Sequence, residues 1–254
     1  MAGPDPTHGS ASMPPADWAL RAGPYRAGLE ATGPIGERLR SLLIDLHTEA
    51  DTGTVGHLAV TANRSGNYTM SSDGRLWDDD VADADLADEM VHLLLRAALD
   101  AEPDLVHIHA GAVGLGARTA IIAGWPGSGK SSAITAMVGS GFDYVTDERL
   151  AVSSDGRSVA GFPKPISLIG ASFDAFAHLN PAHTGIGEHN DTAWQIPASS
   201  FGSVAPPTPR SPSVVVFIAY RPEAALQASP LTPADAAARL LGDSPDIAAR
   251  GRAG

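Results

Sequence analysis

One octapeptide constrains the fold of this chain more than any other feature. Residues 124–131 read Gly-Trp-Pro-Gly-Ser-Gly-Lys-Ser and match the pattern G-x-x-x-x-G-K-[ST] at every position. With this composition, about 0.003 such matches are expected by chance along the whole chain. An apolar run at residues 120–123 precedes the loop, and a helical pattern follows it from Lys130. A strand, a glycine-rich turn and a helix in this order predict a nucleotide site in an α/β fold.

The loop also predicts how a phosphate is held. Its glycines let successive backbone N–H groups point at anionic oxygens, and the following helix adds its positive end. Lys130 is expected to reach the β- and γ-phosphates, and the Ser131 hydroxyl to ligate Mg²⁺. The predicted cofactors are therefore ATP and Mg²⁺. The predicted nucleotide-binding residues are Gly124, Trp125, Pro126, Gly127, Ser128, Gly129, Lys130, Ser131 and Ser132.

Two adjacent carboxylates follow the next expected strand, at residues 142–146. If that strand runs parallel to residues 120–123, Asp147 and Glu148 reach the same sheet edge as the loop, beside the phosphates. One carboxylate can take the proton of an attacking hydroxyl while the other holds a metal ion. We predict Asp147 as the base and Glu148, with Ser131, as a metal ligand. Two solvated acids at a strand end are the alternative.

The spacing of these residues resembles a known kinase core. His109-Ala-Gly, the loop that begins at Gly124 and the Asp147-Glu148 pair resemble HPr kinase/phosphorylase. They look closer still to the HPr-kinase-related proteins that are often encoded beside peptide natural-product pathways. Phe162-Pro-Lys-Pro-Ile-Ser-Leu is similar to a downstream segment of that group. The resemblance covers about residues 103–170 and implies an α/β fold, a P-loop nucleotide-binding core with a mixed sheet flanked by helices.

The resemblance implies an ATP-dependent kinase that transfers the γ-phosphate to a hydroxyl. The implied acceptor is a serine of a peptide or protein, and a small-molecule hydroxyl comes second. His109 is placed near the transferred phosphate, where it could orient the substrate; a half-buried structural histidine is the alternative. Glu148 stands where the family often has Asp, and no Glu-x-Arg-Gly-x-Gly segment follows the pair. The resemblance therefore does not extend to phosphorylase activity or to recognition of the HPr carrier protein.

Two other function classes bear on the same residues. A nucleotide-binding regulatory or scaffold module would keep the loop but transfer no phosphate. A GTPase is disfavoured, because neither lysine of the chain, Lys130 or Lys164, is followed two positions later by Asp. Lys164 lies between two prolines, and its rarity makes it a candidate for a phosphate or substrate contact. A solvated loop lysine is the alternative.

Composition and charge exclude several classes of partner and of site. A formal net charge of −12 argues against coating of nucleic acid or of an anionic membrane. The absence of cysteine excludes disulfides and thiolate metal sites. No apolar run reaches the length of about 18–20 residues that a membrane span needs, and no secretory signal is visible. We therefore expect a cytoplasmic protein without membrane or nucleic-acid partners, and a homo-oligomer remains open. His178, His183 and His189 lack metal-ligand spacing and predict a polar loop instead.

The expected organisation has three parts. They are a flexible lead-in over residues 1–34, a small α+β region over 35–102 and a kinase-like core over 103–254. In the α+β region, residues 37–50 and 83–100 predict helices, and residues 56–61 and 68–77 predict strands, the second broken by a turn at 72–74. In the core, we expect strands at 107–113, 119–123 and 142–146, a hairpin of 149–152 with 158–161, a mobile loop over 180–212, a buried strand at 214–220 and a helix from Pro233.

Overall fold

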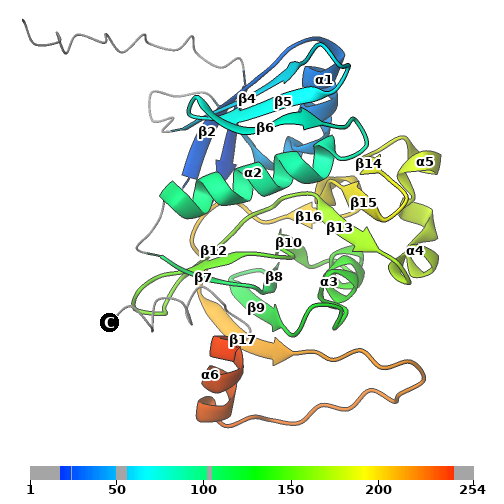
Figure 1. Cartoon of the computed structure of the whole chain (residues 1–254). Coiled ribbons are helices and arrows are strands. Elements are labelled where there is room, and N and C mark those ends of the chain that lie inside the picture. The colour runs from blue at the N-terminus through cyan, green and yellow to red at the C-terminus, as the bar shows by residue number, and fades with distance from the viewer. Residues whose placement is uncertain (1–17, 24, 50–55, 102–104, 243–254) are drawn as a thin grey trace, which may run out of the picture.

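The computed structural model describes residues 18–23, 25–49, 56–101 and 105–242. In these ranges the chain is a mixed α/β protein with one six-stranded sheet, one five-stranded sheet and two three-stranded sheets (Figure 1). The six-stranded sheet and helix α2 (Leu86–Ala101) belong to the N-terminal part, and the glycine-rich loop belongs to the second part. No helix in the described ranges combines the length and apolarity needed to cross a membrane.

The six-stranded sheet has the order β3-β1-β2-β4-β5-β6. Its β2 and β4 strands are parallel, and all other neighbours are antiparallel. The predicted strands at 56–61 and 68–77 and the turn between the halves of the second are confirmed. The strands are β1 (Trp18–Ala22), β2 (Tyr25–Ala31), β3 (His47–Thr48), β4 (Gly56–Ala62), β5 (Tyr68–Ser72) and β6 (Arg75–Val81).

The flexible lead-in expected over residues 1–34 is wrong where the structure describes it. Residues 18–22 and 25–31 pair as an antiparallel hairpin, with Leu20 and Leu29 almost completely buried. These strands are rich in alanine, which has low β propensity, so their composition gave no strand signal. Burial in a shared core overrides that local preference. Residues 1–17 lie outside the described ranges.

Two helices cover this sheet. Helix α1 (Gly33–Leu42) starts and ends earlier than the helix expected at 37–50, and a 3-10 turn (Ile44–Leu46) follows it. A proline in the first turn of α1 supplies the fixed backbone angle that favours a helix start. The helix predicted at 83–100 is confirmed as α2, which lies between the sheet and the second half of the chain (Figure 1). Leu86, Met90 and Leu94 of α2 are inaccessible to solvent.

Because α2 joins the two halves, its core side chains should carry much of the stability. Replacing Leu94 by alanine is expected to lower the free energy of unfolding by about 2–5 kcal/mol, through lost burial and the cavity left behind. Leu76→Ala serves as the control, because Leu76 is 62% exposed and its truncation should cost about 0.5 kcal/mol or less. Urea unfolding measures both. Equal losses for the two variants would contradict the observed packing of α2.

The five-stranded sheet has the order β16-β10-β8-β9-β17. Its β8 strand is antiparallel to both β9 and β10, so β9 and β10 run in the same direction and end at the same edge. Strand β17 is parallel to β9, and β16 is parallel to β10. The bounds are β8 (Gly111–Leu115), β9 (Arg118–Ala123), β10 (Asp143–Thr146), β16 (Ser203–Val204) and β17 (Pro212–Phe217), and helix α3 (Lys130–Gly139) connects β9 to β10.

Gly111, at the start of β8, allows close packing at this edge. A Cβ atom at this position would overlap the Cδ1 atom of Ile134 on α3 and lie 3.1 Å from the carbonyl oxygen of Thr146. The end of β10 therefore lies closer to β8 than a side chain at position 111 would allow without a small shift of its backbone, and the Ile134 side chain would have to turn aside.

The single strand expected at 107–113 is two strands in the structure. Residues 109–110 form a bend that separates β7 (Val106–Ile108) from β8. Strand β7 belongs to a different sheet, with the order β12-β11-β7. The hairpin predicted around residues 153–156 is confirmed as β11 (Leu150–Val152) and β12 (Val159–Gly161).

Residues 180–212 do not form the expected long loop. They contain helix α5 (Pro181–Thr184), strands β14 (Glu188–His189) and β15 (Ala193–Ile196), a 3-10 turn (Ala198–Ser200) and β16. Strand β15 pairs with β13 (Ile166–Ile169), and all four of its residues are buried. Trp194 of β15 stacks on Phe173 of helix α4 (Ser172–Ala175), with ring centroids 4.3 Å apart. One buried strand thus organises a segment whose composition is mostly polar.

The C-terminal elements lie at one side of the five-stranded sheet. The run 214–220 was expected to be a buried strand, but β17 is an edge strand in which Val214 and Val216 are 50% and 39% exposed. The predicted final helix is confirmed as α6 (Pro233–Gly242). The backbone N–H of Asp235 donates to the Thr232 hydroxyl at 3.2 Å, as expected of a helix cap.

Candidate functional site

The glycine-rich loop connects the end of β9 to the first turn of α3. Gly124, Gly127 and Gly129 have φ angles of 152°, 78° and 92°, and Gly129 caps α3 in the left-handed conformation. A Cβ at Gly124 would lie 2.6 Å from both the Ile218 carbonyl oxygen and the Ser128 hydroxyl oxygen, so only glycine fits there. The loop therefore wraps closely around the start of the helix, as a phosphate cradle requires.

Lys130 reaches back across this loop. Its ammonium nitrogen donates to the carbonyl oxygens of Gly124 at 2.6 Å and Trp125 at 3.2 Å, and the residue is 7% exposed. The Ser128 hydroxyl is buried, and it has no hydrogen-bond partner among the described residues. A lysine folded over the loop, a buried hydroxyl and the positive end of a helix together suit an anion.

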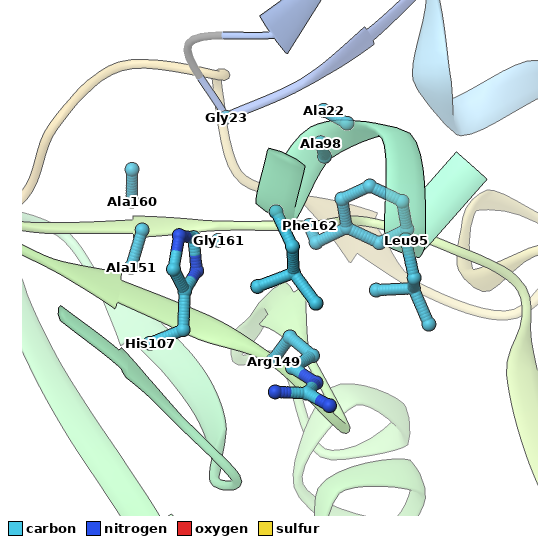
Figure 2. Close-up of a pocket in the computed structure, with 11 residues that line it drawn as sticks. Ala22, Gly23, Leu95, Ala98, His107, Arg149, Ala151, Ala160, Gly161 and Phe162 are labelled. Atoms are coloured by element: carbon cyan, nitrogen blue, oxygen red, sulfur yellow. The ribbon is translucent and has the colours of Figure 1, made fainter. Parts of the chain in front are cut away.

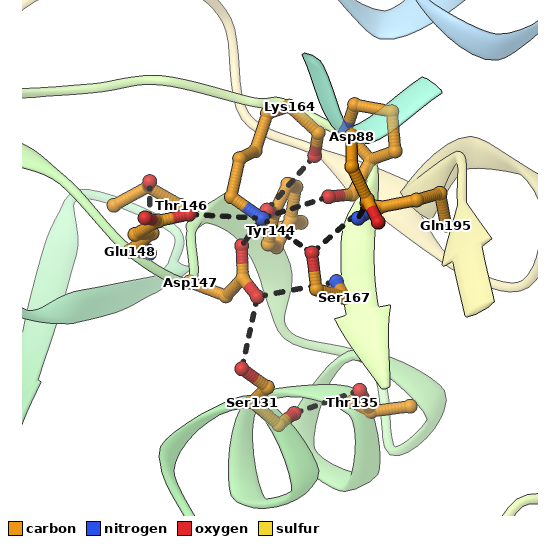
Figure 3. Close-up of polar contacts among 11 residues, drawn as sticks. Asp88, Ser131, Thr135, Tyr144, Thr146, Asp147, Glu148, Lys164, Ser167 and Gln195 are labelled. Atoms are coloured by element: carbon orange, nitrogen blue, oxygen red, sulfur yellow. Dashed lines mark hydrogen bonds and ion pairs between the residues drawn. The ribbon is translucent and has the colours of Figure 1, made fainter. Parts of the chain in front are cut away.

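Ser131 and Asp147 lie side by side at one sheet edge, whereas the sequence paired Ser131 with Glu148 as metal ligands. The Ser131 hydroxyl donates to Oδ2 of Asp147 at 3.0 Å (Figure 3). Ser131 comes from the first turn of α3, and Asp147 directly follows β10. The contact is possible because β9 and β10 run in the same direction, with β8 between them.

Asp147 is buried among polar partners. Its Oδ1 accepts a hydrogen bond from the Tyr144 hydroxyl at 2.9 Å and lies 2.9 Å from the ammonium nitrogen of Lys164. The backbone N–H of Ser167 lies 3.4 Å from Oδ2. Burial, and then the nearby Asp147 carboxylate, raises the pKa of Tyr144 well above its usual value, so its hydroxyl stays protonated as a donor. These contacts fix the orientation of the carboxylate.

The structure corrects the expected role of Lys164. The side chain is completely buried, and its ammonium donates to the Pro165 carbonyl oxygen at 3.0 Å and to the Ser167 hydroxyl at 3.1 Å. It lies 3.4 Å from Oε2 of Glu148. Burial lowers the pKa of Lys164, but the carboxylates of Asp147 and Glu148 outweigh that effect and raise it overall. Lys164 is therefore a cation beneath the carboxylates and is not open to a substrate.

Glu148 and His109 differ from Asp147 in their access to solvent. The Glu148 side chain is 32% exposed, whereas that of Asp147 is 2% exposed. His109 lies in the bend between β7 and β8 and is half-buried. Burial, followed by the charge of Lys130, lowers the pKa of His109, which favours the neutral imidazole near pH 7. The charges of Glu148 and Asp147 act on the pKa of His109 in the opposite direction.

The other predicted residues lie farther from this arrangement or have other contacts. Trp125 is 71% exposed at the tip of the loop. The Ser132 hydroxyl lies 2.9 Å from that of Ser172, so it links α3 to α4. Among the described residues, no group of three or more His, Asp or Glu side chains is arranged to hold a metal ion, and this includes the histidines between residues 178 and 189.

Sequence reasoning missed four side chains in the polar contacts around Asp147, of which two touch its carboxylate and two lie farther along the same chain of hydrogen bonds. They are Tyr144, Ser167, Gln195 and Asp88 (Figure 3). Tyr144 was expected only as a strand residue, although its position three residues before Asp147 puts both on one buried stretch. Gln195 and Asp88 come from distant segments, and no spacing in the sequence connects them to the loop.

A separate cavity lies between the N-terminal part and the sheet that contains β11 and β12 (Figure 2). Leu95, Ala98 and Phe162 make most of it apolar, and His107 and Arg149 also line it. It encloses about 30 Å³, which is room for about two water molecules. The cavity is therefore too small to hold a nucleotide.

Comparison with known proteins found no match for this chain. No protein-family model matches the chain, and no curated protein is significantly similar to it. The residues of the site and their geometry are therefore what indicates the function of this protein.

Proposed function

We propose that this protein is an ATP-dependent kinase of the HPr-kinase-like type, which transfers the γ-phosphate of ATP to a hydroxyl group. One observation carries the proposal above all. The hydroxyl of Ser131, which directly follows the loop lysine, is hydrogen-bonded to the buried carboxylate of Asp147 at 3.0 Å. In P-loop enzymes a serine or threonine at this position and an acidic residue from a neighbouring strand together hold Mg²⁺.

The residues present fit a magnesium nucleotide. The loop N–H groups, the Ser128 hydroxyl and Lys130 supply donors for phosphate oxygens, and the Lys130 ammonium, which donates to two carbonyl oxygens of the loop, can turn to a stronger anionic acceptor. Ser131 and Asp147 would hold Mg²⁺, which usually takes one or two protein oxygens besides phosphates and water. When bound, the metal ion neutralises charge on the phosphates.

The contacts favour roles for Asp147 and Glu148 that are the reverse of those predicted from sequence. Both oxygens of Asp147 already accept hydrogen bonds, and one of these bonds comes from Ser131. Asp147 therefore suits the role of a metal ligand. Glu148 is partly open to solvent, where the hydroxyl of an incoming acceptor can reach it. We therefore assign Glu148 to accept the proton of the attacking hydroxyl. We assign His109, whose pKa burial lowers, to orient that hydroxyl, as the resemblance to the kinase core implies.

The proposed acceptor is a serine of a peptide or protein, with a small-molecule hydroxyl as the second possibility. The test is incubation of the full chain with γ-labelled ATP, Mg²⁺ and sets of serine peptides or small alcohols. Transfer of the label to an acceptor supports the kinase. Binding of ATP with no label leaving it, except to water, would overturn phosphate transfer and leave a nucleotide-binding regulatory module. No binding of ATP would overturn the whole proposal.

A further inference from the structure

We propose that helix α2 of the N-terminal part positions the Asp147 carboxylate through a chain of polar side chains, of which two are buried and two are half-buried. The inference deepens the proposed function and rests on it. We call the chain the Asp88 relay, and its members are Lys164, Ser167, Gln195 and Asp88 (Figure 3). The relay makes the N-terminal part a component of the proposed kinase site. The sequence had predicted that residues 103–254 alone form that site.

Each step of the Asp88 relay is a direct contact. The Lys164 ammonium, 2.9 Å from Asp147 Oδ1, also donates to the Ser167 hydroxyl at 3.1 Å. That hydroxyl donates to Oε1 of Gln195 at 2.9 Å. The amide nitrogen of Gln195 then donates to Oδ1 of Asp88, which lies in the first turn of α2. The relay thus joins three elements: β13 with the residues that lead into it, the central strand β15 and helix α2.

The direction of each hydrogen bond determines which kind of side chain can stand at each place in the relay. An ammonium can only donate, so Lys164 requires acceptors, and the Ser167 hydroxyl that accepts from it must donate onward. Gln195 receives that bond on its oxygen, which leaves its amide N–H₂ to find an acceptor, and the Asp88 carboxylate provides one. Removing the last acceptor would leave a buried donor without its partner and loosen every preceding bond.

A second set of contacts holds α2 in place for this task. Arg38 of α1 pairs with Glu188 of β14 at 2.7 Å and with Asp83, just before α2, at 2.6 Å. Asn190, which follows β14, lies 3.4 Å from Oδ2 of Asp88. The hairpin of β14 and β15 is therefore fixed to the N-terminal part on both sides of the relay. A rigid support of this kind is what holds a metal-side carboxylate in a defined orientation.

The relay is tested by metal affinity in the full chain. We would titrate Mn²⁺ into the protein saturated with ADP and follow the free ion by electron paramagnetic resonance. Asp88→Ala and Gln195→Met are each expected to weaken Mn²⁺ binding by about 10- to 100-fold, the effect typical of losing a partner that orients a metal ligand. Affinity for ADP without metal should stay unchanged, because the loop and Lys130 hold the phosphates.

Two control variants distinguish loss of the positioning of Asp147 from a general loss of protein stability. Asp100→Ala removes an aspartate from the same helix whose ion pair with Arg96 is exposed, and it should leave Mn²⁺ affinity unchanged. Asp88→Asn keeps an acceptor oxygen for Gln195 and should restore most of the affinity. Parental Mn²⁺ affinity in both Asp88→Ala and Gln195→Met would overturn the relay while leaving the kinase intact. Failure of the unmodified protein to bind ADP would instead overturn the proposed function, and the relay with it.

Discussion

Replacing Lys130 by alanine is expected to weaken ATP binding by about 100-fold or more. Its ammonium is placed to make at least two charge-assisted hydrogen bonds to phosphate oxygens, each worth about 1.5–3 kcal/mol, and every 1.4 kcal/mol is about a tenfold change in affinity. The other lysine, Lys164, cannot substitute, because it is buried against Asp147. Isothermal titration calorimetry with ATP and Mg²⁺ measures the effect.

The control for this prediction is Arg118→Ala. Arg118 is an exposed cation at the opposite end of β9, so its removal changes the net charge equally but leaves the loop intact. We expect parental ATP affinity for Arg118→Ala. If Lys130→Ala bound ATP as tightly as the unmodified protein, the glycine-rich loop would not be the phosphate site.

The second large effect separates the two carboxylates. Glu148→Gln keeps the shape of the side chain but cannot take the proton of a hydroxyl, so phosphate transfer should fall by about 10²- to 10⁴-fold. ATP affinity should change little in this variant. Asp147→Asn should instead raise the Mg²⁺ concentration needed for half-maximal transfer, because it removes a charged oxygen from the site beside Ser131.

A Mg²⁺ titration of transfer rate and of ATP affinity, carried out on both variants, gives the decisive comparison. Recovery of Asp147→Asn at high Mg²⁺, with no recovery of Glu148→Gln, would support the roles assigned from the contacts. The reverse pattern would restore the assignment predicted from sequence, with Asp147 as the base. Parental transfer rates in Glu148→Gln at all Mg²⁺ concentrations would rule this carboxylate out as the proton acceptor.

Local patterns predicted much of the fold. The helix at 83–100 and the hairpin around residues 153–156 are confirmed, because their apolar periodicity and turn residues agree with their tertiary surroundings. Residues 18–31 and 193–196 were missed as strands, since pairing with distant partners, and not local propensity, determines their conformation. The prediction of a single strand at 107–113 was wrong for a related reason, because the two halves of this segment pair in different sheets.

The site was predictable to the extent that spacing along the chain fixes it. Spacing predicted that the carboxylates after the next strand lie at the same sheet edge as the glycine-rich loop, and there the structure bonds Ser131 to Asp147, not to the Glu148 expected as its metal partner. The burial of Lys164 and the separate surroundings of Asp147 and Glu148 could not be predicted, because they depend on contacts between separate segments, such as those of Lys164 with Asp147 and with Ser167. Adjacent residues of similar chemistry acquire different roles only from their surroundings.

The glycine at the start of β8 has a consequence for how such a site could change over time. A Cβ at position 111 would overlap Cδ1 of Ile134 on α3, and it would lie 3.1 Å from the Thr146 carbonyl oxygen and 3.3 Å from Cα of Asp147. The Ile134 side chain could turn aside, but the backbone at the end of β10 would have to shift. Because that backbone carries Asp147, whose carboxylate accepts a hydrogen bond from Ser131, a substitution at position 111 would disturb this contact without replacing either of the two residues.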